Sequence, residues 1–581
     1  MEIINITEDG GRWLCRFGYD PYLIHGIKRV GGSRWLPRQK AWAIPATLDS
    51  FSAMNEQFPQ EQLSWEPSII RWQKERLRHA ERLRGLSMAD TAELTTLPEL
   101  HPELYKYVSS RGYQLADIAF MAEAAHPMNT NQPGTGKTVE TIASVFEAGL
   151  DETPVLVVAP KTALAPVWLQ EGLEWLSGRG IPVGTVTGAG DPLAALQRDA
   201  TAGRPCWVIA NPEAIKRRKD GSSKYPWMYE VDWGVFVIDE FHRMGLNNNQ
   251  TLAYQSFRKI KADKRIALSG TPMGGRPIKL WSVLNFLYPE MFPSKWAFAG
   301  NWLNVHDNGF GKTIGDVKKH KRDEFTMMMA EYSTRRIKRD IMTWLPPKQY
   351  VDLYVDMTPK QRKQYDEWEA NGEIEIEEQQ LDALSILALY TRLRQFAGAM
   401  QRVETADGEP NLFPTTESCK LPMLWEILEE RGLTEQDDAT DKSPVIVFSQ
   451  FTRMIDMVEE WLTESGVKTA KITGAVSADE RTAEIERFQS GGVDVFLMNT
   501  NAGGVAITLD RADTVVFLDE TWNPDDQEQA EDRAHRGGKT SQVTVYRIIT
   551  KDTIEDRVRK GNITKDTVNK RVLDARTKVV K

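Results

Sequence analysis

Two stretches of the chain alternate short, continuous apolar runs with longer segments of mixed polarity. The apolar runs lie at 155–159, 207–210, 235–238 and 266–268 in the first stretch, and at 445–448, 495–498, 515–518 and 543–546 in the second. Short runs of this kind predict strands that are buried on both faces of a parallel sheet, with helices on either side. The pattern therefore predicts an α/β protein with two lobes.

The segments around these stretches differ from them in composition and in their pattern of apolar residues. Residues 66–90 carry many Arg, Lys and Glu side chains and predict a charged helix, whereas residues 292–401 are rich in Met, Lys, Glu and Trp and predict a helical region. A break is expected at Leu345-Pro346-Pro347-Lys348, because proline cannot continue a helix. Residues 1–62 predict a small separate unit with strand-like ends and a turn at Gly31-Gly32.

These patterns divide the chain into six expected parts. They are a small N-terminal α+β module (1–62), a helical linker (63–104), a first lobe (105–290), a helical insertion between the lobes (291–414), a second lobe (415–550) and a basic C-terminal helical segment (551–581). The length of 581 residues agrees with this division, since about 150 residues per domain gives about three or four domains.

Composition places the chain among ordinary globular proteins, with 41% hydrophobic and 27% charged residues. Its three cysteines are far apart, which argues against a disulfide framework or a zinc site. The chain has neither an apolar run of membrane-spanning length nor a secretory start, so we expect a cytoplasmic protein, or a nuclear one in a eukaryote.

The net charge of −9 argues against nucleic-acid binding, but basic clusters at 216–219, 335–339 and 557–581 leave room for a local basic surface.

The strongest chemical signal is a glycine-rich loop that precedes a helix-forming segment. It consists of Gly134, Thr135, Gly136, Lys137 and Thr138. Glycines let backbone N–H groups curl around phosphates, and the following helix adds its positive N-terminal end. We expect Lys137 to reach the β- and γ-phosphates of ATP and Thr138 to bind Mg²⁺. The strict pattern asks for glycine at position 131, where this chain has Asn131.

A pair of carboxylates follows the apolar run at 235–238. Asp239 is expected to hold the metal, and Glu240 to polarise the attacking water, because hydrolysis of a phosphoanhydride needs a positioned nucleophile. Taken alone, the pair also fits the polar end of an ordinary core strand.

Two arginines, Arg533 and Arg536, follow the second set of strands at a spacing that puts them on one face of a helix. Arginines from a second lobe can clamp a γ-phosphate, since guanidinium groups stay charged and make two-pronged phosphate contacts. Taken alone, such a pair is more often a surface salt-bridge face.

The motifs in their order resemble the Swi/Snf-type DNA-dependent ATPases of helicase superfamily two, over residues 105–560. Beyond the phosphate loop and the Asp239-Glu240-Phe241-His242 box, the resemblance is carried by further blocks. They are Val158–Lys161 with Trp168, Leu268–Pro272, Arg335-Arg336, Val447–Phe451, Lys471–Gly474, Asn501–Val505, Trp522–Pro524 and the arginine helix 529–536.

This resemblance implies two RecA-like lobes and translocation along double-stranded DNA, driven by ATP with Mg²⁺. It implies catalytic roles for Lys137, Asp239, Glu240, Arg533 and Arg536. It also implies nucleotide contacts from Gln114 and Gly504, and DNA contacts from Lys161, Asn211, Ser449, Gln450, Asn501 and Trp522.

The first 60 residues resemble the HARP domain, a module found beside the motor in annealing helicases. The resemblance rests on Phe17-Gly18-Tyr19, Arg34-Trp35, Lys40-Ala41-Trp42 and Ile44-Pro45. It implies action on forked or branched DNA. The compact length favours a protein of bacterial or viral type, and we expect a monomer. Aromatic residues interleaved with Lys and Arg suit a single-strand or junction surface. The same tryptophans could equally form the core of a small domain.

Two departures from the family pattern affect the expected coupling to DNA. The family usually has Asp-Glu before its phosphate loop, where this chain has Asn131-Gln132, and Ala506-Ile507-Thr508 replace Gly-Leu-Asn. Two alternatives stay open: an RNA- or DNA-unwinding helicase of the same superfamily, and a catalytically weak DNA-binding scaffold.

Overall fold

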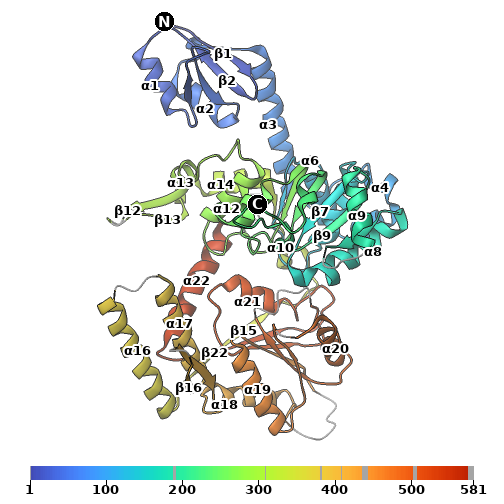
Figure 1. Ribbon diagram of the computed structural model, residues 1–581, viewed down its shortest axis with the longest axis vertical. Helices are drawn as coiled ribbons and strands as arrows, with labels where there is room; N and C mark the ends of the chain where they lie inside the picture. The colour runs from blue at the N-terminus through green and yellow to red at the C-terminus, as the bar shows by residue number, and fades with distance from the viewer. Residues whose placement is uncertain are drawn as a thin grey trace.

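The structure is a computed structural model that describes residues 2–186, 191–307, 309, 311–379, 383–406, 409–434, 442–474, 476–500 and 507–572. Figure 1 shows a small module at one end of the molecule, a first lobe in the middle and a second lobe at the other end. Among the described residues, no helix combines the length and the apolar character needed to cross a membrane.

The N-terminal module is a five-stranded sheet packed against two helices. The strands β1 (Ile4–Asp9), β2 (Arg12–Arg16), β3 (Arg34–Leu36), β4 (Ala41–Pro45) and β5 (Leu63–Trp65) pair in the order β3-β4-β2-β1-β5. The helices are α1 (Pro21–Arg29) and α2 (Leu48–Gln57). Trp13 is 1% exposed and meets Phe51, Trp65 and Trp72 edge-on, so it belongs to the core. Trp35 is 48% exposed and lies against Trp42, so the tryptophans divide between core and surface.

A long helix, α3 (Pro67–Met88), connects the module to the first lobe and confirms the charged helix predicted at 66–90. Its Arg84 pairs with Glu331 at 3.0 Å, and its Ser87 hydroxyl donates to the Ser333 carbonyl at 2.7 Å. The helix is thus attached to the first lobe near its C-terminal end.

The first lobe is built on a seven-stranded sheet in the order β14-β6-β11-β10-β7-β9-β8, in which every pair is parallel. Its strands are β6 (Met128–Asn129), β7 (Pro154–Val158), β8 (Val183–Thr185), β9 (Cys206–Ala210), β10 (Asp232–Ile238), β11 (Lys261–Leu268) and β14 (Ser333–Thr334). Strands β7 and β9 are buried along their whole length. This burial is the reason their sequences are continuously apolar.

The second lobe has a six-stranded parallel sheet in the order β15-β22-β21-β18-β20-β19. Its strands are β15 (Gln349–Val355), β18 (Val445–Ser449), β19 (Thr469–Ile472), β20 (Val495–Asn499), β21 (Thr514–Phe517) and β22 (Thr544–Thr550). The two parallel sheets, each covered by helices, confirm the predicted α/β fold with two lobes.

The region at 292–401 is less helical than predicted. It holds the helices α13 (Lys295–Trp302), α14 (Arg322–Tyr332), α16 (Pro359–Gln379) and α17 (Ala383–Gly398). It also holds the hairpin of β12 (Leu303–Asp307) and β13 (Lys312–Val317). Two of its segments, β14 and β15, become edge strands of the two lobes. The prediction failed there because an edge strand forms by pairing with a distant neighbour, which local sequence does not reveal.

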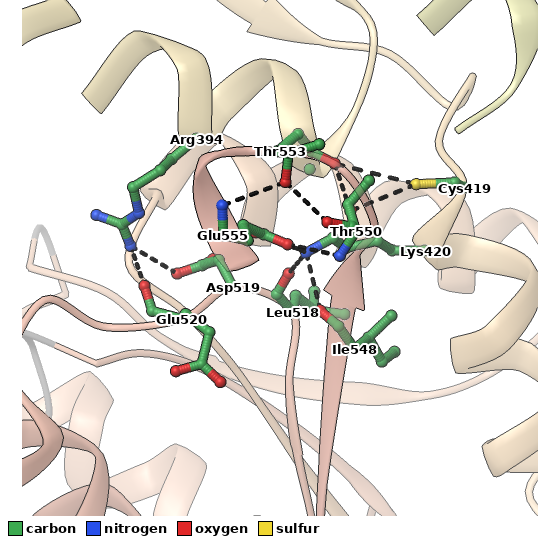
Figure 2. A network of polar contacts seen from close by, with 12 residues as sticks. Arg394, Cys419, Lys420, Leu518, Asp519, Glu520, Ile548, Thr550, Thr553 and Glu555 are labelled. Carbon is green, nitrogen blue, oxygen red and sulfur yellow. Dashed lines mark hydrogen bonds and ion pairs between the residues drawn. The ribbon is translucent and has the colours of Figure 1, made fainter. Parts of the chain in front are cut away.

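A buried ionic network fixes the C-terminal helix α22 (Ile554–Val572) to the second sheet (Figure 2). The Lys420 ammonium contacts both Glu555 carboxylate oxygens at 2.7 and 2.8 Å and donates to the Leu518 and Ile548 carbonyls. Both side chains of the ion pair are 0% exposed. Nearby, Arg394 of α17 donates to the Glu520 carbonyl and lies 3.8 Å from Asp519. Helices α17 and α22 are therefore held at the carboxyl ends of β21 and β22.

Candidate nucleotide-binding and catalytic site

The phosphate loop connects β6 to α7 (Lys137–Glu147) in the first lobe. Gly134 and Gly136 have φ angles of +80° and +100°, a region that favours glycine, and Gly136 caps the helix. A side chain at Gly136 would collide with the Gln114 amide, since a built Cβ lies 2.3 Å from its nitrogen. The Lys137 ammonium donates to the loop's own carbonyls at Asn131 (3.0 Å) and Gln132 (3.3 Å). The loop thus has the curled backbone that an oligophosphate needs.

The two predicted carboxylates lie at the carboxyl end of β10. One Asp239 oxygen accepts from the Trp168 indole at 2.9 Å, and the other accepts from the Glu240 amide at 2.9 Å. Burial, and then the neighbouring Glu240, raise the pKa of Asp239 to about 6. Glu240 has a φ of +47°, which is rare for a residue with a side chain and marks local strain of the kind found at functional sites.

The Glu240 carboxylate has a close neighbour from each lobe. His242 of the first lobe lies with Nδ1 3.3 Å from one Glu240 oxygen, and Gln529 of the second lobe donates to the other at 3.3 Å. Burial lowers the pKa of His242 to about 3, so its ring is neutral at physiological pH. The same ring contacts the Ser269 and Thr271 hydroxyls at 2.8 and 3.3 Å, which joins the carboxylate box to the loop after β11.

The second lobe contributes the two predicted arginines. Arg533 and Arg536 follow α21 (Pro524–Glu531) and line the same cavity of about 530 Å³ as Lys137, Asp239 and Glu240. Burial, and then Arg536, lower the pKa of Arg533 to about 9, which leaves it charged at neutral pH. Thr135, which is fully buried and bonded to Gln132, lies outside the lining, whereas Gly134, Gly136 and Thr138 belong to it.

Position 131 of the loop has an amide and not a carboxylate, and another element supplies a carboxylate beside it. Asp117 of α6 (Gly112–Glu123) accepts from the Arg336 guanidinium at 2.7 and 2.9 Å and from the Asn131 amide at 2.8 Å. Asp117, Asn131 and Glu140 are all 0% exposed. Burial, followed by Asp117, raises the pKa of Glu140 to about 8. Arg336 forms its ion pair with Asp117, at 2.7 Å.

Gln114, an expected nucleotide contact, packs against the phosphate loop. Its amide donates to the Thr135 carbonyl at 3.1 Å, and its side chain is 0% exposed. Tyr107 and Arg111 line the cavity beside it instead. The expected contact at Gly504 falls outside the described residues, as do Asn501 and Ala506, while Thr508 lines the cavity.

The expected DNA contacts differ in their accessibility. Lys161 is exposed just after β7, and Asn211 is half-buried after β9, where its side chain caps a short helix. Ser449 is fully buried and donates to Asp519, while Gln450 and Trp522 are half-buried. Trp522 packs against Tyr390 and under the Arg394 guanidinium at 5.1 Å. In this structure, Ser449 therefore has an internal partner, whereas Lys161 faces solvent.

Several residues that support the site were not predicted from the sequence to do so. Trp168 holds Asp239, Gln529 reaches Glu240, and Lys338 and Lys348 pair with Asp532 beside Arg533. The sequence motifs contain these residues, but their partners lie far away along the chain. The spacing of residues within a motif therefore could not predict these contacts.

Two sequence profiles match the chain, one for each lobe. The SNF2-related domain matches residues 113–401, and the helicase conserved C-terminal domain matches residues 420–538. The chain therefore belongs to the SNF2-related (SWI/SNF) family of helicase superfamily two, a family of helicase-like ATPases. The HARP-like assignment of the N-terminal module remains a prediction.

Two named relatives are similar to this chain over most of its length. The human "SWI/SNF-related matrix-associated actin-dependent regulator of chromatin subfamily A member 1" is 29% identical over 79% of this chain and 43% of its own length. The "ATP-dependent DNA helicase DDM1" of Arabidopsis thaliana is 29% identical over 81% of this chain and 63% of its own length. The chain thus spans less than two thirds of these relatives. A solved "SWI2/SNF2 ATPase core in complex with dsDNA" from Sulfolobus solfataricus is 23% identical over 80% of this chain and 92% of that one, with a TM-score of 0.35.

The residues present fit ATP with Mg²⁺. The loop offers a helix N-terminus and a lysine for phosphates, and the Thr138 hydroxyl and the Asp239 carboxylate are oxygen ligands of the kind that Mg²⁺ prefers. When bound, Mg²⁺ would neutralise phosphate charge. Lys137 and the two arginines supply further positive charge from opposite walls of the cavity.

Proposed function

We propose that this chain is an ATP-driven motor that moves along double-stranded DNA. The observation that carries the proposal is one cavity lined from both lobes, with Lys137, Asp239 and Glu240 on one wall and Arg533 and Arg536 on the other. A site divided in this way is complete only when the lobes approach each other. Hydrolysis can therefore be linked to lobe movement.

The residues have separate tasks in the proposed hydrolysis. Lys137 and the loop amides bind phosphate oxygens, while Glu240 orients a water molecule for in-line attack and accepts its proton. The arginines stabilise the negative charge that spreads over the transferred phosphoryl oxygens. Gln529 of the second lobe donates to one Glu240 oxygen and so helps to orient the carboxylate for this task.

Double-stranded DNA is the proposed track. The relative named "ATP-dependent DNA helicase DDM1" supports this choice, and Lys161 offers an exposed cation at the carboxyl edge of the first sheet. Contacts of this type reach the phosphate backbone and carry no base sequence. We expect turnover to be stimulated by duplex DNA, without sequence preference and with strong sensitivity to salt.

Action on forked or branched DNA is the finer part of the proposal, and it depends on the N-terminal module. Trp35 is half-exposed, and Lys28 lies over the ring of Trp42 at 5.8 Å, which gives an aromatic and basic face suited to unpaired bases.

We place the protein in the cytoplasm, or in the nucleus of a eukaryote, and we expect a monomer.

Replacement of Glu240 by Gln tests the catalytic assignment. The variant keeps the shape of the side chain but loses the proton acceptor, so turnover should fall at least about 100-fold while ATP still binds. Glu230→Gln, at an exposed residue just before β10, is the control and should match wild type. Preserved turnover in Glu240→Gln would remove Glu240 from this role.

A comparison of activators tests the track. ATP turnover is measured without nucleic acid and with duplex DNA, forked DNA, single-stranded DNA and duplex RNA. Stimulation by duplex DNA supports the motor, and a preference for forks supports the role of the module. Stimulation by RNA alone would favour the RNA helicase, and equal turnover in every condition would contradict the motor.

A further inference from the structure

We propose that the interlobe linker, residues 335–348, is the element that sets the arginines of the second lobe against the phosphate loop of the first, with Lys338 as its main positioning residue. This inference rests on the proposed ATPase function and adds to it a mechanical connection between the two halves of the site. The linker joins the last strand of the first sheet, β14, to the first strand of the second sheet, β15.

At its beginning, the linker is bonded to the entrance of the phosphate loop. Arg335 donates to the Thr130 and Gly270 carbonyls, and the Arg336 amide donates to the Asn131 side chain at 2.8 Å. The Gln132 amide donates to the Arg336 carbonyl at 3.0 Å. The Lys338 amide in turn donates to the Gln132 side chain at 2.7 Å. The loop entrance and the start of the linker are therefore held together by several hydrogen bonds between backbone and side-chain groups.

The same linker holds the segment that carries the arginines. The Lys338 ammonium pairs with Asp532 at 2.8 Å and donates to the His535 carbonyl at 3.2 Å. Lys348 pairs with Glu531 at 2.9 Å and with Asp532 at 3.0 Å. Asp532 directly precedes Arg533, and His535 directly precedes Arg536. Each arginine thus has a neighbour fixed by the linker.

These ion pairs are buried, which distinguishes them from ordinary surface pairs. The side chains of Lys338, Lys348 and Asp532 are 8%, 10% and 6% exposed. Although burial raises the pKa of Asp532, Lys338 and Lys348 lower it to about 2, so the carboxylate stays charged. A buried ion pair contributes little net stability compared with apolar side chains, but it fixes one geometry because each charge requires its partner. We therefore infer that these ion pairs position the segment that carries Arg533 and Arg536.

Lys338 acts from behind the loop and lies outside the cavity lining. A Cβ built on Gly134 would lie 3.5 Å from the Lys338 side chain, so the lysine packs against the outer side of the glycine loop. One side chain thus contacts both the phosphate loop and the arginine segment. Loss of its charge should displace the arginines without removing a group that binds ATP.

Lys338→Met tests this inference, and Arg339→Met is its matched control. Arg339 is the next residue, with a side chain that is 80% exposed and paired with Asp340. We expect Lys338→Met to lower the DNA-stimulated kcat about 10- to 100-fold, because a displacement of about 1 Å at a catalytic group can cost about 100-fold. The KM for ATP and the affinity for DNA should stay within about twofold of wild type, since the binding groups are untouched. Arg339→Met should match wild type.

A double variant separates positioning from direct contact with ATP. If Lys338 acts through Asp532, then Lys338→Met combined with Asp532→Leu should lose no more kcat than the more severe single variant. A raised KM with unchanged kcat in Lys338→Met would mean that the lysine binds the nucleotide, which overturns the inference. Losses in kcat that multiply in the double variant would also overturn it.

Folding is monitored by the melting temperature of each variant. If Lys338→Met does not fold, Lys348→Gln replaces it, because it removes the second cation from the same carboxylate and should also lower kcat at unchanged KM. Wild-type kcat in a folded Lys338→Met, or in a folded Lys348→Gln used in its place, overturns the linker inference alone. A wild-type chain without DNA-stimulated turnover overturns the proposed function, and the linker inference with it, so the two failures are distinguishable.

Discussion

At the level of single residues, the buried Arg336 takes its carboxylate partner from α6 and not from the phosphate loop. Asn131 provides no carboxylate at the entrance of the phosphate loop, yet Arg336 is buried there and has a charged partner, Asp117. A buried guanidinium without a partner would carry a large desolvation cost. The departure from the family pattern at position 131 is therefore accommodated by Asp117, and it does not by itself indicate a decayed site.

Asp117→Asn should therefore destabilise the protein by about 3–5 kcal/mol, because it leaves the Arg336 charge buried and unpaired. The double variant Asp117→Asn with Asn131→Asp returns the charge to the loop and should recover most of that loss. Urea unfolding of the two single variants and the double variant measures the coupling. Strictly additive effects would show that the two positions do not share Arg336.

At the scale of elements, buried ion pairs decide where the C-terminal helix lies. The pair of Lys420 and Glu555 ties the start of α18 (Lys420–Glu430) to the start of α22 and to the ends of β21 and β22 (Figure 2). The C-terminal segment was predicted to be basic and helical from its composition. Its attachment depends on one acidic residue near its start.

Lys420→Met should cost about 3–5 kcal/mol of unfolding free energy, since it strands the Glu555 carboxylate in the core. Arg557→Ala is the control on the same helix. Arg557 pairs with Glu369 at 3.2 Å, but its side chain is 62% exposed, so its loss should cost less than about 1 kcal/mol. Chemical denaturation of both variants checks this, and equal losses would contradict the importance of burial.

At the scale of the whole molecule, the two lobes meet through polar groups whose charge depends on pH. Gln132 of the first lobe donates to Glu528 of α21 at 2.9 Å. Burial raises the pKa of Glu528 to about 7, against the opposing effect of Lys348. Asp532, Arg335 and Glu531 also face this carboxyl group. The folded protein therefore holds a proton on Glu528 at a pH where the unfolded chain has released it.

The sign of the pH effect follows from this proton. Between the ordinary pKa of about 4.5 and the raised value of about 7, the folded state binds more protons than the unfolded state, so the Glu528 contribution to stability falls as pH rises. Glu528→Gln mimics the protonated group and should remove this part of the slope. Melting temperatures of both proteins from pH 5 to pH 8 provide the measurement, and parallel curves would contradict the assignment.

Much of the fold could be predicted because a parallel sheet leaves a strong local signal. The runs at 155–159, 235–238, 445–448 and 495–498 became central strands, since burial on both faces demands continuous apolar sequence. Two edge strands were missed because they lack such a run: β14 has only two residues, and most of β15 is exposed or half-buried. In the same way, the motifs identified Lys137 and Glu240, while Trp168 and Gln529 gave no sign of their partners.

The residues of the motifs set the chemistry of each half of the site. A glycine loop can curl only where glycines stand, and carboxylates at the end of an apolar strand must lie at the edge of its sheet. How the two halves meet depends on contacts that form only in the folded protein. Three sets of contacts join residues from different elements: the hydrogen bond from Asn131 to Asp117, the ion pair of Lys420 with Glu555, and the contacts of the linker residue Lys338. Such contacts depend on desolvation and distance in space, and neither quantity is encoded by spacing along the sequence.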